Sequence, residues 1–339
     1  MKEEREAVRK IVIGVAGVGR IGRLHIENIQ RFIPDVEVKA ISDPFANLDE
    51  AGEAFGVKDR YRDYNELLAD RDIEAVIVAS STDKHAEISI AAARMGKQIF
   101  CEKPVDPDPA RILEVIDEVK KAGVKFQVGF NRRFDHNFRQ VRKTVESGEI
   151  GEVHIVRVTS RDPAPPPIEY VKVSGGLFCD MMIHDFDMVR YLSGSEPVEI
   201  FASGAVLIDP AIGEAGDIDT AAVIIRFSSG ALGIIDNSRR AVYGYDQRVE
   251  VFGSKGQAVA HNDKPTTVEV STADSVTTDK IPYFFLDRYT GAFVDQFRSF
   301  FDSLRSGEAV LVGELDGLRS VEMALAATES YRTGLPVKL

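Results

Sequence analysis

The sequence has few cysteines and no long apolar run, and each shortage excludes a class of protein. Two cysteines in 339 residues cannot form a disulfide framework or a Cys-rich zinc or iron–sulfur site. A reducing compartment, the cytoplasm, fits best. No stretch of about 20 apolar residues exists, so we expect no membrane span. The start, Met1–Lys10, is mixed in charge without an apolar core, so we expect no signal peptide there.

Positive charge is also in short supply. The chain has 42 Lys and Arg against 54 Asp and Glu, and its net charge is −12. This balance argues against nucleic acid or an anionic membrane as the main partner. The hydrophobic share of 44% is ordinary for a globular chain, and the length suggests two domains. We expect a cytoplasmic, two-domain protein whose partner is a small molecule.

The first third of the chain alternates short apolar runs with helical patterns. The clearest helix spans residues 109–122, with Asp108 as N-cap, Pro109 as first residue and Gly123 as terminator. Alternating strands and helices imply βαβ units and a parallel sheet, that is, an α/β fold. We assign this Rossmann-type domain to residues 1–129. Its expected strands are 11–16, 36–42, 75–79, 98–101 and 125–129, and its other expected helices are 22–32 and 84–95.

After about residue 150 the pattern changes to β-like runs separated by glycine or polar turns. Such runs are typical of a mainly antiparallel sheet with one face free. This second domain covers residues 130–339. Residues 162–167 are rich in proline and predict a stiff loop, either a pocket wall or a spacer. The expected strands are 154–160, 199–207, 220–227, 231–238, 248–252 and 257–260, and the expected helices are 180–192, 289–306 and 315–332.

A glycine motif directly follows the first strand. Gly17, Gly19 and Gly22 stand in the order G-x-G-x-x-G and open a helix. Gly17 permits the tight turn, Gly19 lets the backbone approach a pyrophosphate, and Gly22 lets the helix pack against the strand. The helix N-terminus then offers N–H groups and partial positive charge to phosphate. The alternative is a glycine turn that binds nothing.

An acidic residue in the right place supports nucleotide binding. Asp43 ends the second strand 21 residues after Gly22, where a carboxylate would bind the ribose 2′-hydroxyl. No arginine is adjacent to it, which favours NAD over NADP. Ser80 and Thr82 follow the third strand, so their hydroxyls are further candidates. The predicted cofactor contacts are Gly17, Gly19, Arg20, Ile21, Gly22, Asp43, Ser80, Thr82, His85 and Glu102. For the two histidines of this region, His25 and His85, a purely structural role is the alternative to a role in the site.

Two groups of residues have the chemistry of a catalytic site. Lys103 follows the strand 98–101, at the strand end that faces the ligand crevice, where it could stabilise a developing alkoxide. The alternative is a solvated turn lysine. Asp180, His184 and Asp187 are spaced i, i+4 and i+7 on an expected helix, with Met182, Phe186 and Val189 on its core face.

The pairing of Asp180 with His184 has three interpretations. A carboxylate one turn from an imidazole orients it and suits it to take a proton from an alcohol. The first alternative is an ordinary helix-end carboxylate beside a surface histidine. The second is a metal site, but no third ligand is evident, so we predict no metal.

These motifs together resemble the glucose–fructose oxidoreductase / inositol dehydrogenase superfamily. The resemblance rests on Gly17–Gly22 with His25, on Glu102-Lys103-Pro104, and on Asp180-x-x-x-His184, and covers nearly the whole chain. Some longer stretches are similar to the inositol 2-dehydrogenase branch. These are 129–135, 159–167, 183–187 and 237–246.

The resemblance implies a Rossmann domain followed by an α/β domain with a large, open, mainly antiparallel sheet, which often serves as a tetramer interface. It implies NAD-dependent oxidation of a ring hydroxyl of a cyclic polyol, foremost myo-inositol to its 2-ketone. In that reaction His184 is the base, Asp180 orients it, and Lys103 holds the reacting hydroxyl. Another inositol isomer, a sugar, ketone reduction and a non-enzymatic sensor remain alternatives. By position, the candidates for polyol hydroxyls also include Arg132, Asp162, Asp187 and Tyr245. Asp162 stands where some relatives carry Asn, which leaves the preferred isomer open.

Overall fold

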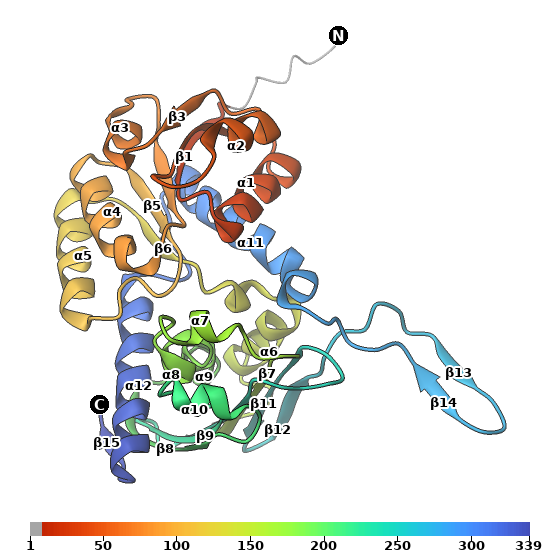
Figure 1. The fold of residues 1–339 in the computed structure, drawn as a ribbon. Helices are drawn as coiled ribbons and strands as arrows, with labels where there is room; N and C mark the ends of the chain where they lie inside the picture. The colour runs from red at the N-terminus through yellow and green to blue at the C-terminus, as the bar shows by residue number, and fades with distance from the viewer. Residues whose placement is uncertain (1–8) are drawn as a thin grey trace. The chain divides into compact units, whose positions relative to one another are not determined.

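The computed structural model describes residues 9–339, and its internal contacts divide the chain into two units. The first unit consists of the chain up to Phe130 together with a later segment, Phe293–Leu318. The second unit consists of Asn131–Ala292 and Arg319–Leu339 (Figure 1). From the sequence we expected one division at residue 130, and this expectation did not assign Phe293–Leu318 to the first unit. The expectation for Met1–Lys10 falls mostly on residues 1–8, outside the described part.

The first unit is built on a six-stranded, wholly parallel sheet. Its strand order is β3-β2-β1-β4-β5-β6, the order of a Rossmann fold. Figure 1 shows α3, α4 and α5 on one side of this sheet and α1, α2 and part of α11 on the other. The strands are β1 (Ile11–Ala16), β2 (Val36–Ser42), β3 (Asp59–Tyr61), β4 (Ala75–Val78), β5 (Gln98–Cys101) and β6 (Phe126–Val128). The helices are α1 (Arg20–Phe32), α2 (Leu48–Phe55), α3 (Tyr64–Ala69), α4 (Thr82–Arg94) and α5 (Pro109–Ala122).

Local sequence explains why α5 forms where expected. The Asp108 side chain accepts a hydrogen bond from Ala110 N at 2.9 Å, Pro109 opens the helix, and Gly123 ends it at φ +67°. The core of the unit also needs the returning segment. Phe297, Phe300 and Phe301 of α11 (Phe285–Ser306) are fully buried against the side chains of β1, β2 and α1.

The second unit contains a seven-stranded mixed sheet in the order β12-β11-β7-β10-β9-β8-β15. Only the β7–β10 pair is parallel; the other five pairings are antiparallel. This confirms the expected mainly antiparallel sheet. The strands are β7 (Val153–Arg161), β8 (Pro197–Ala205), β9 (Thr220–Phe227), β10 (Leu232–Ser238), β11 (Asp246–Gly253), β12 (Gly256–Ala260) and β15 (Val337–Lys338).

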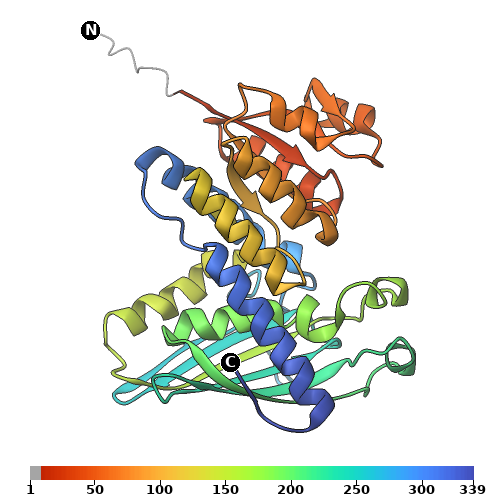
Figure 2. The same ribbon diagram turned by 90° about the vertical axis from the view of Figure 1, so that its left-hand side faces the viewer.

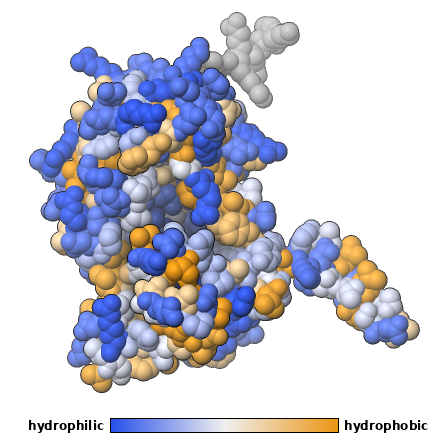
Figure 3. Space-filling view, in the orientation of Figure 1, coloured by the Kyte–Doolittle hydropathy of each residue, from blue (hydrophilic) through white to orange (hydrophobic). Residues whose placement is uncertain are grey.

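Helices of the second unit lie along one face of this sheet, and Figure 2 shows its lower face without a helix in the described part of the chain. A two-stranded hairpin projects from the same unit with exposed valines along it (Figure 3). The helices are α6 (His136–Glu146), α7 (Ile168–Val171), α8 (Gly176–Asp180), α9 (Ile183–Ser193), α10 (Pro210–Glu214), the first turns of α11 and most of α12 (Glu314–Thr333), with a 3-10 turn, η1 (Asn131–Phe134). The hairpin pairs β13 (Glu269–Ser271) with β14 (Val276–Thr278).

Candidate active site

The register of the first sheet brings the predicted cofactor residues to one edge. Ala16 at the end of β1 pairs with Ser42 of β2 and Val78 of β4, and Val78 pairs with Cys101 of β5. The residues that come next therefore share the carboxyl edge of the sheet. They are Gly17, Asp43, Ala79 and Glu102. The strand order reverses between β1 and β4, and ligands of open α/β sheets bind at such a point.

The three glycines of the motif have three different surroundings. Gly17 has φ +99°, and a Cβ there would lie 2.4 Å from the backbone of Ala79. A Cβ on Gly22 would lie 2.0 Å from the carbonyl oxygen of Gly17. A Cβ on Gly19 would meet no atom within 4 Å. Packing therefore requires glycine at Gly17 and Gly22. Gly19 instead borders open space through which a ligand can approach the backbone.

Two of the helices that begin at this edge, α1 and α4, lack side-chain caps. Gly19 is the N-cap of α1, with no side-chain hydrogen bond and no acidic residue in the first turn. Ser81, the N-cap of α4, makes no capping bond either. Arg20 and Ile21 open α1, and Thr82 opens α4. The N–H groups at both helix starts are therefore suited to an anion such as a pyrophosphate.

Asp43 joins the glycine turn to the loop after β2. Its Oδ2 accepts from Val18 N at 2.9 Å, and its Oδ1 accepts from Phe45 N and Ala46 N at 2.9 and 2.8 Å. Burial raises the pKa of Asp43, but the three backbone bonds and the Arg62 charge outweigh it, so the pKa is lowered. An ionised carboxylate has about four acceptor sites, so one remains for a ribose hydroxyl.

The turn that carries Lys103 is held by two buried histidines. His25 Nε2 lies 2.6 Å from Glu102 Oε1, and Glu102 Oε2 accepts from the backbone N–H of Lys103 at 3.3 Å. His85 Nδ1 lies 2.7 Å from the carbonyl oxygen of Pro104, and the Lys103–Pro104 peptide bond is cis. The sequence placed Lys103 at this strand end correctly, but it did not reveal these supports.

The environment of Glu102 keeps this carboxyl ionised. Burial raises its pKa, but the hydrogen bond from His25 and the charges of His25, Lys103 and His85 act the other way, and the net pKa is lowered. One carboxylate oxygen of Glu102 contacts His25 and the other accepts from the backbone N–H of Lys103, so the Glu102 side chain stabilises the turn that carries Lys103. Its predicted contact with the cofactor stays a prediction.

In the second unit, Asp180 and His184 lie at the junction of two helices. The single helix expected over residues 180–192 is wrong, because α8 ends at Asp180 and α9 begins at Ile183. At the break, Met182 N–H bonds the carbonyl of Leu177, five residues back, instead of four. Asp180 and His184 are both partly exposed. The i, i+4 argument for their shared face therefore does not apply as made. The expected core side chains, Met182, Phe186 and Val189, are fully buried.

Asp180 is held by residues that sequence spacing could not reveal. Tyr170 Oη donates to Asp180 Oδ1 at 2.8 Å, and the guanidinium of Arg239 lies 3.6 Å from Asp180 Oδ2 and 3.5 Å from Asp217 Oδ2. Asp217 in turn accepts from Leu177 N at the start of α8. Tyr170 and Arg239 thus hold the Asp180 carboxylate, and Asp217 helps to hold Arg239.

Two of the predicted polyol-binding residues, Arg132 and Tyr245, belong to one buried network in this unit. Arg132 donates to Asp185 and reaches Ser160 Oγ and Tyr245 Oη at 3.3 and 3.4 Å. Asp162 lies in the field of the same groups. Burial raises its pKa to about 6, the charges of Arg239 and Arg132 limit the rise, and those of Asp180 and Asp185 add to it. Asp185, which the sequence analysis did not select, is fully buried and also accepts from Asn237 at 2.9 Å.

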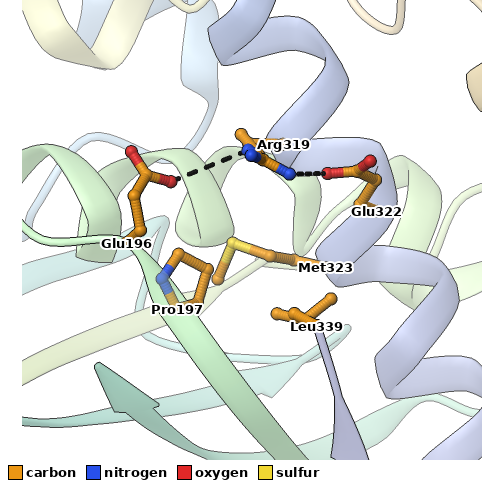
Figure 4. Close-up of a pocket in the computed structure, with 6 residues that line it drawn as sticks. All are labelled: Glu196, Pro197, Arg319, Glu322, Met323 and Leu339. Atoms are coloured by element: carbon orange, nitrogen blue, oxygen red, sulfur yellow. Dashed lines mark hydrogen bonds and ion pairs between the residues drawn. The ribbon is translucent and has the colours of Figure 1, made fainter. Parts of the chain in front are cut away.

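Two other clusters do not have the properties of a catalytic site. Carboxylates of Asp135 and Asp263 lie beside His136, but both also pair with the buried guanidinium of Arg288, whose charge opposes a metal ion there. A cavity of about 100 Å³ lies elsewhere in this unit. Figure 4 shows that Arg319, which lines it, pairs with Glu196 and Glu322. That volume corresponds to about three waters, which is too small for a dinucleotide.

The first unit thus has the strand order, two uncapped helix starts, the open Gly19 and a carboxylate, Asp43, at the end of β2, as a dinucleotide-binding domain requires, and its residues fit NAD. The class defined here is a Rossmann-type, NAD-dependent oxidoreductase. The comparisons with known proteins agree. Residues 11–130 match the model of the oxidoreductase family with an NAD-binding Rossmann fold, and residues 138–259 match the GFO/IDH/MocA C-terminal domain. The chain belongs to this family.

Similar proteins extend over the whole chain. It is 49% identical to a myo-inositol 2-dehydrogenase of Thermotoga maritima, over 96% of this chain and 98% of the relative. It is 46% identical to an inositol 2-dehydrogenase of Rhizobium meliloti, over 94% and 96%. The crystal structure of a scyllo-inositol dehydrogenase from Lactobacillus casei with bound NAD(H) and scyllo-inositol superimposes with a TM-score of 0.91 at 30% identity, covering 97% of this chain and 99% of that one.

Proposed function

We propose that the chain oxidises a ring hydroxyl of a cyclic polyol with NAD, foremost myo-inositol to 2-keto-myo-inositol. The observation that carries the proposal is the joint presence of a nucleotide edge with Lys103 at its β5 end and a supported Asp180 four residues before His184. Relatives at 46–49% identity bear the names of inositol 2-dehydrogenases. In this proposal residues 1–129 bind NAD, and residues 130–339 bind the substrate and form the oligomer interface.

Each catalytic residue has one task in this proposal. Bound NAD supplies the hydride acceptor for the carbon that is oxidised. His184 takes the hydroxyl proton, because imidazole titrates near neutral pH and is an effective base there. Asp180, fixed by Tyr170 and Arg239, orients this imidazole. Lys103 donates to the reacting oxygen and stabilises its developing negative charge.

The network around Arg132 supports a polyol site rather than an apolar one. Arg132 and Tyr245 offer donors, and Asp162 offers an acceptor when ionised. Because burial raises the pKa of Asp162 to about 6, its charge state changes near neutral pH. We propose that Asp162 selects among inositol isomers through this acceptor.

The test is a substrate panel with purified protein and NAD, followed by NADH absorbance. We expect turnover on myo-inositol. No turnover on any inositol, pyranose or keto-sugar, in either direction, would contradict the proposal and favour a non-enzymatic sensor. Turnover on scyllo-inositol or a pyranose alone would favour the alternative substrates.

Three variants separate chemistry from folding. His184→Ala and Lys103→Met are expected to lower kcat by about 10²–10⁴-fold, the usual range for a lost acid–base or oxyanion group. Both should still bind NAD, as measured by calorimetry. Lys58→Met, a change at an exposed lysine, is the matched control and should leave kcat unchanged. Undiminished turnover in His184→Ala would remove it as the base.

We propose further that the chain forms a homotetramer through the open face of its second sheet. One row of paired residues crosses that face from β8 to β9, Phe201 opposite Ile224, and both are substantially exposed (38% and 52%). Leu232 and Phe252 are exposed on the same face. Light scattering should report a tetramer for the parent and smaller species for Ile224→Glu; a monomeric parent would contradict this.

The compartment follows from different observations. No described helix is long and apolar enough to cross a membrane. Both cysteines are free, Cys101 fully buried and Cys179 partly so, and free thiols are typical of a reducing compartment. We propose a cytoplasmic location.

A further inference from the structure

His85 makes two polar contacts of the same kind. It lies in the second turn of α4 and is only 2% exposed. Its Nδ1 lies 2.7 Å from the carbonyl oxygen of Pro104, and its Nε2 lies 3.0 Å from the carbonyl oxygen of Ser80. Both distances are those of hydrogen bonds.

The two carbonyl oxygens determine how many N–H groups the His85 ring needs. A carbonyl oxygen only accepts hydrogen bonds, and a neutral imidazole carries a single N–H. Neutral His85 would therefore point a nitrogen lone pair at one of the two oxygens, inside the protein, where such a mismatch is costly. An imidazolium donates to both oxygens at once.

We propose that His85 is a doubly protonated positioning residue that ties the turn carrying Lys103 to the end of β4. Pro104 directly follows Lys103, and Ser80 stands two residues after the last residue of β4. The imidazolium therefore bridges the ends of neighbouring strands, one of which bears the proposed alkoxide-binding lysine. The proposal rests on the role given to Lys103 above.

The groups around His85 decide whether such a charge is tolerable. The N-terminus of α4 disfavours a cation, whereas the carboxylate of Glu102, whose pKa responds to the charge of His85, favours it. The remaining titratable groups are on α4 itself or on α3, β5 and α5, which pack against it. They include Asp83, Lys84 and Glu87 on α4, Tyr64 on α3, Cys101 on β5, Lys103 and Asp106 after it, and Arg111 on α5.

The geometry also changes the role predicted for His85. With both ring nitrogens facing protein carbonyls, its effect on a bound nicotinamide runs through Ser80 and Pro104 rather than through direct contact. His25 supports the same turn differently, since its Nε2 contacts the Glu102 side chain. The two histidines thus hold Lys103 from either side along the chain.

The first experiment reads the charge directly and needs no substrate. Nitrogen-15 spectra of the histidine rings are recorded on the full-length protein from pH 6 to pH 9, and His85→Gln assigns the His85 signals. We expect both nitrogens of His85 to carry a proton at pH 7. A single protonated nitrogen at pH 7 overturns the proposal, whatever the enzyme's substrate proves to be.

The second experiment separates positioning from a merely structural role. A misplacement of about 1 Å in a catalytic group costs up to about 10²-fold in rate, so His85→Gln should lower kcat about 10–100-fold. The KM for the polyol and the Kd for NAD should change by less than about 3-fold.

Controls keep the second experiment interpretable. His261→Gln changes an exposed histidine and should leave kcat, the KM for the polyol and the Kd for NAD as in the parent. Equal losses in kcat and NAD affinity in His85→Gln would contradict the proposal. If the parent turns over no polyol, the proposed function fails while the ring spectra still decide the charge of His85.

Discussion

Arg133 holds both carboxylate oxygens of Asp187 inside the second unit. Its Nε lies 2.9 Å from Oδ2, its Nη2 lies 2.6 Å from Oδ1, and the two side chains are 6% and 1% exposed. The guanidinium also lies 5.0 Å from the ring centre of Tyr191. Asp187 was predicted from the family pattern to contact substrate, but in this arrangement its oxygens already serve the fold.

Asp187→Asn should therefore act on stability. Removing one partner of a buried ion pair leaves an uncompensated charge and costs about 3–5 kcal/mol. Urea unfolding at pH 7 measures this, and Asp295→Asn, which breaks the more exposed pair with Arg298, should cost less than about 1 kcal/mol. A raised KM for the polyol with unchanged stability would instead restore Asp187 as a substrate ligand.

Two alanine variants of the glycine motif should fail in opposite ways. Gly17→Ala forces a side chain onto a backbone at φ +99° and into contact with Ala79, and should destabilise the fold by about 2 kcal/mol or more. Gly19 has φ −70° and open space at its Cβ position, so Gly19→Ala should fold normally and lose NAD affinity. Thermal melts and calorimetry with NAD give the two readouts; a normal NAD affinity in Gly19→Ala would contradict the cofactor site.

Asp43 should control the choice between NAD and NADP. Arg62 Nη1 donates to the carbonyl oxygen of Ala46 at 2.7 Å and lies beside the same loop. Asp43→Ser removes a charge that repels a 2′-phosphate and leaves this arginine nearby. A hydrogen bond to a charged group contributes about 1.5–3 kcal/mol, so the KM for NAD should rise about 10-fold or more, and relative use of NADP should increase. Asp49→Ser, at an exposed carboxylate, should change neither.

Asp162 should make stability depend on pH with an unusual sign. Its pKa is raised from 3.8 to about 6 by burial, so between these values the folded state holds a proton that the unfolded state has lost. Stability is thus present at low pH and falls as the pH rises toward 6, by roughly 3 kcal/mol. Asp162→Asn should raise the melting temperature at pH 8 and leave it nearly unchanged at pH 4.

A second carboxylate provides the control of opposite sign. Burial raises the pKa of Asp219, but hydrogen bonds from the N–H groups of Leu207, Ile208 and Asp209 outweigh it, and the pKa is lowered. Its contribution is present above the unfolded pKa and is lost as the pH falls. Asp219→Asn should therefore lower the melting temperature at pH 8. The same direction of change in both variants would contradict the assignment for Asp162.

Much of the nucleotide edge was predictable because its signals are local. A strand, three glycines, a helix and an acid follow one another within 33 residues, from Ile11 to Asp43, and each signal depends on backbone conformation near its own position. The caps of α5 are local in the same way. Lys103 was placed at the sheet edge because parallel strands in a βαβ fold end on the same side.

The break between α8 and α9 was not predictable from periodicity. Asp180 and His184 keep helical spacing in the sequence, but the turn between them is widened by the bond from Met182 to Leu177, and Asp217 caps α8 from forty residues away. Periodicity reports which residues could share a face and does not register one displaced hydrogen bond.

The sequence by itself determined the class of fold, the nucleotide-binding edge and the residues of the proposed catalytic set. Only the tertiary structure decided which groups support them: Arg239 on Asp180, His25 on Glu102, and His85 on the carbonyl of Pro104. It also decided that Phe297 and its neighbours return to the first core. The physical reason is distance along the chain. Local propensity acts over a few residues, whereas these partners are 19 to 77 residues apart and meet only when the strands pair and the core closes.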